Sequence, residues 1–256
     1  MPGMVNHGPQ EMKQQNSPYI PLSRYLSVVA VCLWLLIIGC SGDNDGDAVG
    51  NTPSTNVSGF RFLDLNAASR LDDSLRRNLR ENLGSDAIWR RSPLDLEINY
   101  DGFLKQHFVE LYRLNRRLNY APRERVEHDV SKLMYRYPQK KNLPFTYIEL
   151  VFAGSNDEPL VFNIRAKQDG AAVVETLEDK YGIPGRIEWN GGKNHALYWR
   201  NPGELMIASV VEDRYGQPEY GISIFFVDHL KNLVEDEERQ RRQMQKQKEK
   251  AGKTAF

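Results

Sequence analysis

Between residues 131 and 227 the apolar pattern changes from the helical period to a period of two, and seven short segments are predicted to be strands. Most connections between them are short and rich in Gly, Asn and Pro, as in Asn190–Asn194 and Asn201–Gly203. Loops this short join antiparallel neighbours, because a parallel pair needs a crossover of about a dozen residues or more. The sequence therefore predicts a meander-rich antiparallel sheet of about seven strands. These strands are 131–137, 145–152, 160–164, 186–189, 196–199, 205–211 and 220–227.

Helical periodicity precedes this sheet and recurs within it. Leucine recurs every four residues from Leu71 to Leu83, with Asp72 near the start and Gly84 after the end, which predicts a helix over 71–83. Further helices are predicted over 102–119 and 171–181 and from about residue 228 onward, and a short strand over 94–98. We expect an α+β fold in which helices cover one face of the antiparallel sheet.

Composition divides the chain into five parts. We predict a signal peptide over 1–39, a lipidated cysteine with a flexible tether over 40–59, a mainly helical region over 60–130, the sheet region over 131–234 with one helix, and a charged tail over 235–256. The helical region and the sheet region are expected to form one domain. The tail places acidic residues before basic ones, an order that suits a helix dipole, so we predict a charged segment that is helical or disordered.

Charge and cysteine content exclude several classes of protein. The 34 basic residues are balanced by 34 acidic ones, which excludes a nucleic-acid binder that relies on bulk positive charge. Two cysteines exclude a disulfide scaffold and a multi-cysteine metal site. The chain has no Walker loop, dinucleotide fingerprint, Gly-x-Ser-x-Gly or His-Glu-x-x-His motif. We therefore predict no cofactor, no metal site and no catalytic residues, and the sequence favours a protein that is not an enzyme.

The densest apolar run, Tyr25–Gly39, is 15 residues long, whereas a membrane-spanning helix needs roughly 20 apolar residues. Arg24 precedes this run and small residues follow it, as in a signal peptide. The residues Ile37-Ile38-Gly39-Cys40 resemble a lipobox, so the chain is similar to a bacterial lipoprotein precursor. That resemblance implies cleavage before Cys40, attachment of a diacylglycerol to its thiol and acylation of its new amino terminus. We expect the protein to be attached to a membrane, its expected partner, through this lipid anchor.

The resemblance also implies a location. In Gram-negative lipoproteins an Asp directly after the lipidated cysteine retains the protein at the inner membrane, and Ser41 stands there instead. We expect an outer-membrane lipoprotein that faces the periplasm, with an inner-membrane anchor as the alternative. Two other interpretations stay open: an uncleaved N-terminal anchor helix with Cys40 unmodified, and a buried core segment. The start residue is Met1, Met4 or Met12.

Three aromatic residues on adjacent predicted strands form a candidate binding surface, namely Trp189, Tyr198 and Trp199. Tyr198 and Trp199 are neighbours in one strand and must point to opposite faces, so one reaches the core and the other can join an outer aromatic patch. The order of a helix, a Tyr-Gly-x-Pro turn at Tyr181–Pro184 and a Trp-bearing meander is loosely similar to small outer-membrane lipoproteins of the barrel-assembly machinery. This fold-level likeness implies no residue roles.

Taken together, these features favour a lipid-anchored envelope protein, namely a non-catalytic periplasmic interaction or structural module with an envelope protein as its partner and no nucleic acid. The first alternative is an envelope hydrolase whose site is assembled from distant residues. Its candidate residues are His107, His128 and His195 with strand carboxylates such as Glu149 and Glu188. The second alternative is a lipoprotein that binds a small ligand on the concave face of the sheet, which requires an apolar pocket of roughly a few hundred Å³.

Overall fold

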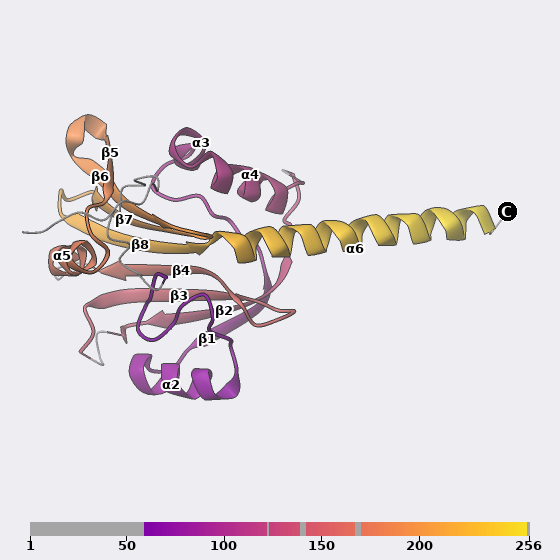
Figure 1. Cartoon of the computed structure of the whole chain (residues 1–256), viewed down its shortest axis with the longest axis horizontal. Coiled ribbons are helices and arrows are strands. Elements are labelled where there is room, and N and C mark those ends of the chain that lie inside the picture. Colours follow the sequence, from indigo (N-terminus) through magenta and orange to yellow (C-terminus); the bar gives the residue numbers. More distant parts are fainter. Residues whose placement is uncertain (1–58, 122, 139–141, 167–169, 255–256) are drawn as a thin grey trace, which may run out of the picture. The chain divides into compact units, whose positions relative to one another are not determined.

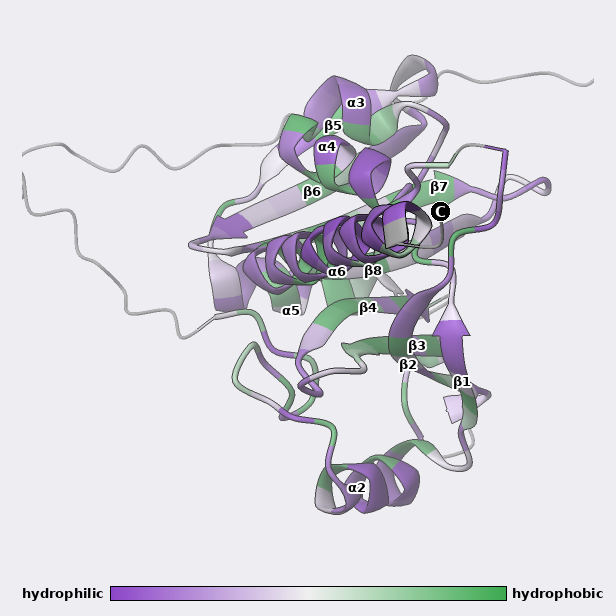
Figure 2. Cartoon of the chain, turned by 90° about the vertical axis from the view of Figure 1, so that its right-hand side faces the viewer, coloured by the Kyte–Doolittle hydropathy of each residue, from purple (hydrophilic) through white to green (hydrophobic). Residues whose placement is uncertain are grey.

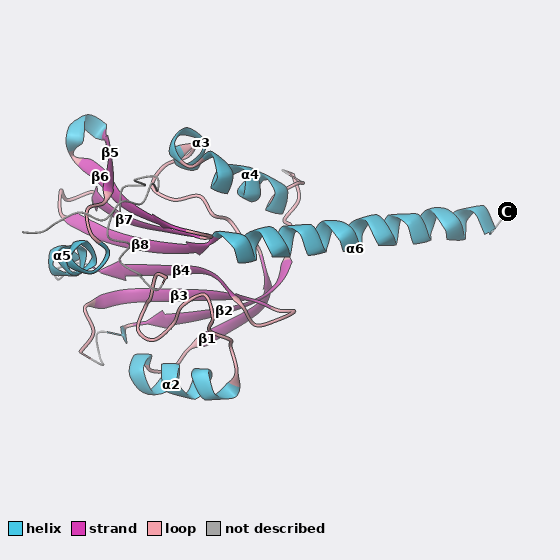
Figure 3. Cartoon of the chain, viewed as in Figure 1, coloured by secondary structure: helices cyan, strands magenta, loops and turns pink. Residues whose placement is uncertain are grey.

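A computed structural model describes residues 59–121, 123–138, 142–166 and 170–254. Its centre is one antiparallel sheet of eight strands in the order β1-β2-β3-β4-β8-β7-β6-β5 (Figures 1 and 3). The strands are β1 (Ala87–Ser92), β2 (His128–Arg136), β3 (Phe145–Ala153), β4 (Pro159–Ala166), β5 (Gly185–Trp189), β6 (Asn194–Asn201), β7 (Glu204–Glu212) and β8 (Pro218–Phe226). Two four-stranded meanders, β1 to β4 and β5 to β8, meet at the β4–β8 pair. The predicted α+β class is confirmed.

All seven predicted strands are present, and the eighth is β1. The short strand predicted over 94–98 is wrong, because residues 93–98 belong to no strand or helix. Leu94 and Leu96 are nevertheless buried, with 3% and 1% of their surface exposed. The alternation of apolar residues there comes from a loop whose leucines point into the core.

The helices are α2 (Asp73–Leu83), α3 (Phe103–His107), α4 (Val109–Leu118), α5 (Gly170–Tyr181) and α6 (Val227–Thr254), with a 3₁₀ turn, η3 (Asn190–Gly192), between β5 and β6. At the start of α2, the side chain of Asp72 accepts the backbone N–H of Leu75 at 2.6 Å, which caps the helix. The single helix predicted over 102–119 is two helices. The break is at Phe108, whose φ of −137° and ψ of 65° are not helical.

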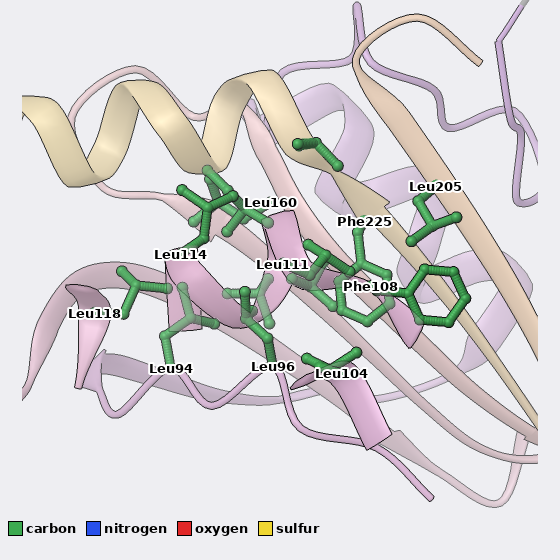
Figure 4. Packing of buried hydrophobic residues seen from close by; sticks show 14 of the residues in the cluster. Leu94, Leu96, Leu104, Phe108, Leu111, Leu114, Leu118, Leu160, Leu205 and Phe225 are labelled. Carbon is green, nitrogen blue, oxygen red and sulfur yellow. The ribbon is translucent and has the colours of Figure 1, made fainter. Parts of the chain in front are cut away.

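Helices cover both faces of the sheet, so the expectation that they cover one face is wrong. On the first face, α3, α4 and the start of α6 pack on the sheet; Figure 4 shows Leu111 and Leu114 of α4 beside Leu160 and Phe225 of the strands. On the second face, α2, α5 and residues 60–67 pack on the sheet. Leu150 and Val151, which point to opposite faces of β3, are both at most 1% exposed. A central strand that is buried on both sides needs two covering layers.

The first turns of α6 pack against the sheet and the helix α4, and its last turns do not. Leu230 and Val234 are buried in the core of the first face. Three polar contacts add to this packing: Lys231 Nζ to Glu110 Oε1 at 2.8 Å, Glu237 Oε2 to His128 Nδ1 at 2.9 Å, and Arg117 Nε to Glu238 Oε1 at 2.9 Å.

From Arg242 to Lys253 every residue of α6 is exposed, and Figure 2 shows this helix as predominantly hydrophilic. The tail predicted over 235–256 is therefore helical as far as Thr254, and its acidic start docks on the body. Among the described residues, no helix combines the length and the hydropathy that crossing a membrane requires.

Candidate functional site

The helices on the first face cover only part of the sheet. Side chains in register across neighbouring strands form rows. An apolar row on β3, β4 and β8 lies in the core under α4 and α6 and consists of Val151, Val161 and Phe225. Two residues away along each strand, the next row on the same face is polar and consists of Glu149, Asn163 and Ser223. We call these three residues the polar row.

A cavity of about 990 Å³ lies over the polar row. Its floor includes a further row of the same face, made by Tyr147, Arg165 and Gly221 and continued by Ser209 on β7. Part of its wall is the segment Glu97–Asn99, which lies between β1 and α3. This volume is at the upper end of the range for small-molecule sites, and the lining includes the charged side chains of Glu149, Arg136 and Arg165.

Hydrogen bonds join the polar row across the strands. Asn163 Nδ2 donates to Glu149 Oε1 at 3.3 Å, and Ser223 Oγ donates to Asn163 Oδ1 at 2.8 Å. Glu149 Oε2 accepts the hydroxyl of Tyr147 at 3.0 Å and lies 3.6 Å from Lys132 Nζ. A carboxylate has about four acceptor sites, so Glu149 keeps capacity for one more donor. The row is therefore joined across three strands, and Glu149 can still accept one further hydrogen bond.

Tyr147 lies between two arginines, Arg136 on β2 and Arg165 on β4. Burial raises the pKa of Tyr147 to about 12; the nearby Glu149 carboxylate also raises it, and both arginines lower it. The Arg165 guanidinium lies 5.9 Å from the centre of the Tyr147 ring. Because the pKa is raised, the phenol stays neutral and remains a hydrogen-bond donor well above neutral pH.

Gly221 keeps the floor of the cavity open. It pairs with Arg165 on one side and with Ser209 on the other. A Cβ atom at this position would meet no heavy atom within 4 Å, and the backbone is not in the left-handed region that favours glycine. The backbone therefore does not require glycine here, and the missing side chain adds open volume to the site.

Glu97 contributes a carboxylate to the cavity wall. Its Oε1 accepts the backbone N–H of Leu104, the second residue of α3, at 3.2 Å. Burial raises the pKa of Glu97, the hydrogen bond from Leu104 opposes this shift, and the charges of Asp95 and Asp101 add to it. Glu97 therefore takes up a proton at a higher pH than an exposed glutamate does.

The residues predicted as a binding surface lie on both faces of the sheet. Trp189 is on the first face, where its ring centre is 5.6 Å from those of Tyr100 and Phe103. Tyr198 is on the same face, with its ring edge-to-face against Phe108 at 5.4 Å. Trp199 is in the core of the second face, which confirms that Tyr198 and Trp199 point in opposite directions.

These three rings do not form a continuous patch on the outer surface of the protein. Trp199 is 5% exposed, and its Nε1 donates to the carbonyl of Gly182 at 2.8 Å. Tyr198 and Trp199 both line a smaller pocket of about 290 Å³, and none of the three is among the residues of the large cavity. A binding role for these residues stays a prediction. Cys40 lies outside the described residues, so its lipidation also stays a prediction.

The three histidines of the hydrolase alternative lie in different environments. His107 Nε2 is 3.1 Å from the hydroxyl of Tyr100, and the buried His128 contacts Glu237. His195 is on β6, which four strands separate from the β2 strand that carries His128. Burial lowers the pKa of His195, as does Arg186, while Glu188 raises it. The structure therefore joins none of these histidines to another through a described hydrogen bond.

The two strand glutamates considered as an acid–base pair are also far apart. Glu149 is on β3 and Glu188 is on β5, with four strands between them. At about 4.8 Å between strands, this separation is roughly 24 Å, which is too large for a catalytic carboxylate pair. Glu188 Oε1 instead accepts from Arg186 Nε at 2.7 Å.

The sequence pattern did not single out Tyr147, Asn163 or Ser223 as site residues. One signal was present in the strand LVFNI, where Asn163 interrupts an otherwise apolar run. In a central strand whose two faces are otherwise buried under helices, a polar residue in an apolar run indicates a position that the helices do not cover. This signal becomes readable only once both faces are known to be covered.

Among the described residues, no three side chains of His, Cys, Asp or Glu gather closely enough to hold a metal ion. Comparison with protein-family models, with curated proteins and with solved structures finds no match. The function is therefore argued from the geometry of the cavity and its polar row.

Proposed function

We propose that this protein is a lipid-anchored binding protein of the cell envelope that holds a polar small molecule in the cavity over Glu149, Asn163 and Ser223 and carries out no chemistry on it. The observation that carries the proposal is the hydrogen-bonded polar row on the floor of a cavity of about 990 Å³. Side chains on the strands of a sheet are positioned more precisely than side chains on loops, which suits a preorganised site.

The location of the polar row supports a binding role. The neighbouring apolar row is covered by α4 and α6, so the fold has helices available to bury this face. The polar groups of the next row keep hydrogen-bonding capacity beyond the bonds they make to one another, and water or a polar ligand can use it. A ligand that replaces this water without leaving Glu149 or Asn163 unpaired gains affinity from groups that are already in place.

The arrangement of donors supports binding over catalysis. The hydroxyl of Ser223 donates to an amide oxygen, Oδ1 of Asn163, which cannot take its proton. The described residues that line the cavity include no histidine and no cysteine. The Glu149 carboxylate contacts three donor groups, so the geometry favours a fixed acceptor over a mobile proton carrier.

A ligand screen with a cavity-filling variant tests the proposal. The full-length protein and Gly221→Phe are screened by thermal unfolding against neutral sugars, amino acids, nucleotides and polyols. A ligand at about 100 times its Kd stabilises the folded state by about 2.7 kcal/mol, so we expect at least one compound to raise the Tm of the wild type and not that of Gly221→Phe. The proposal fails if no compound shifts the wild type, or if the variant responds equally.

The envelope anchor has its own test. The resemblance of Ile37–Cys40 to a lipobox supports lipidation of Cys40. Intact-mass and peptide mass spectrometry of the protein from bacterial membranes should find a mature amino terminus at Cys40 that carries a diacylglycerol and an acyl chain. An unmodified Cys40 contradicts the anchor and leaves the binding site to be judged separately.

A further inference from the structure

We infer that the cavity over the polar row takes a neutral, hydroxyl-rich ligand, namely a saccharide. This inference rests on the proposed function and names the chemical class of its ligand. Three observations lead to it: the balance of charge in the cavity, the mixture of donors and acceptors on its floor, and the position of the tyrosine ring between polar groups.

The charges of the cavity oppose one another. The described lining carries three carboxylates, those of Glu97, Glu149 and Glu219, and two guanidinium groups, those of Arg136 and Arg165. Lys132 adds a positive charge beside Glu149. A phosphate or dicarboxylate that approaches the arginines therefore meets carboxylates of the same site, and a cation meets the arginines. A neutral ligand meets neither repulsion.

The floor offers donors and acceptors side by side. Glu149 presents a carboxylate, Asn163 an amide with both functions, and Ser223 a hydroxyl. These side chains come from three adjacent strands and each lies within hydrogen-bond distance of the next, so they form one continuous polar strip on the cavity floor. A sugar hydroxyl both donates and accepts, so it can bond to any member of the row, whereas a group that only donates or only accepts suits part of it.

The aromatic ring lies beside these polar groups. Tyr147 shares the cavity floor with the polar row, and its hydroxyl donates to Glu149 at 3.0 Å. A tyrosine is already neutral near pH 7, and the raised pKa extends this to higher pH, so the Tyr147 ring contributes aromatic surface without adding an anion. A pyranose combines an apolar C–H face with a rim of hydroxyls, which matches an aromatic ring next to carboxylate and amide groups.

Two other ligand classes fit less well. An apolar molecule would remove water from Glu149 and Asn163 without replacing its hydrogen bonds, at a free-energy cost of several hydrogen bonds. An extended peptide binds sheets most readily by pairing its backbone with an edge strand, and the edges here are β1 and β5, whereas the cavity lies over β3, β4, β8 and β7.

A glycan array with matched variants tests the ligand class. The full-length protein is probed on an array of neutral and anionic oligosaccharides, with parallel panels of inorganic polyphosphate, inositol phosphates and short peptides. The best neutral glycan is then titrated by calorimetry against the wild type, Glu149→Gln, Gly221→Phe and Glu188→Gln. Glu149→Gln keeps the shape of the side chain, and Glu188→Gln makes the same chemical change on β5 outside the cavity.

The expected result is a neutral oligosaccharide whose affinity falls at least tenfold in Glu149→Gln and in Gly221→Phe and stays within twofold in Glu188→Gln. If polyphosphate, inositol phosphates, anionic glycans or peptides bind and no neutral glycan does, and that binding is lost in Gly221→Phe, the saccharide inference is overturned while the proposed function stands. If nothing binds in a way that depends on Gly221, both are overturned.

Discussion

The carboxylate of Glu237 on α6 lies 2.9 Å from Nδ1 of His128, the first residue of β2. His128 is 1% exposed, so its imidazole is a buried polar group, and its contact with Glu237 joins α6 to the sheet. The other ring nitrogen, Nε2, is buried and has no hydrogen-bond partner among the described residues. The imidazole therefore depends on Glu237 for its hydrogen bonding.

We predict that Glu237→Ala lowers the free energy of unfolding by about 1–3 kcal/mol, because a buried polar group is left unpaired. Urea unfolding of the full-length protein, followed by circular dichroism, measures this change. Glu249→Ala is the matched control on the exposed end of α6 and should stay within about 0.5 kcal/mol of the wild type. Equal effects of the two substitutions would contradict the role of the contact.

We predict that the Arg117–Glu238 ion pair makes a pH-dependent contribution to the free energy of unfolding. The hydrogen bonds from Arg117 hold the pKa of Glu238 below its usual value, so the pair stabilises the fold above the unfolded pKa of about 4.3 and loses this effect as pH falls through the lower folded pKa. The side chains are 41% and 26% exposed, so the contribution is below about 1 kcal/mol.

Urea unfolding of the wild type and of Arg117→Gln at several pH values measures this contribution. The difference in unfolding free energy should be constant near pH 7 and shrink below about pH 4, where Glu238 becomes protonated in the unfolded and then in the folded state. Arg116→Gln, a change at an exposed neighbour in α4, should show no such dependence. A difference that is independent of pH would rule out the pair as its source.

The sequence predicted seven of the eight strands of the sheet, but it missed β1 and did not predict which helices cover which face. Short loops and alternation predicted the antiparallel strands, because both signals are local. Strands such as FTYIELVF carry apolar residues on both faces, which indicates that both faces are buried. Tertiary packing decides which helix covers each face, and the local sequence pattern does not contain that information. The polar row depends on pairing between β3, β4 and β8, whose residues are up to 74 positions apart in the chain (Glu149 to Ser223).

Tyr135 lies in the core of the second face with 0% of its surface exposed. Its hydroxyl has no hydrogen-bond partner in the part of the chain that the structure describes, and burial is the main cause of its raised pKa. We predict that Tyr135→Phe leaves stability unchanged or raises it by up to about 1–2 kcal/mol, because it removes an unpaired buried oxygen.

The matched substitution is Tyr147→Phe, which removes a hydroxyl that donates to Glu149. It should lower stability by about 0.5–1.5 kcal/mol, so the two variants should move in opposite directions or differ clearly in urea unfolding. A loss of stability in Tyr135→Phe as large as in Tyr147→Phe would show that the Tyr135 hydroxyl does have a partner.

Gly221 and Gly185 are both strand glycines on the first face, and they predict opposite responses to the same substitution. A Cβ atom at Gly221 would meet open space over the cavity floor, whereas a Cβ atom at Gly185 would overlap the ring of Tyr198. Gly221→Ala should raise the free energy of unfolding by about 0.4–1 kcal/mol, because it restricts the unfolded chain without strain. Gly185→Ala should lower it by about 1–3 kcal/mol through overpacking. Urea unfolding of the two variants measures both changes, and a loss of stability in Gly221→Ala would mean that the cavity floor is not open.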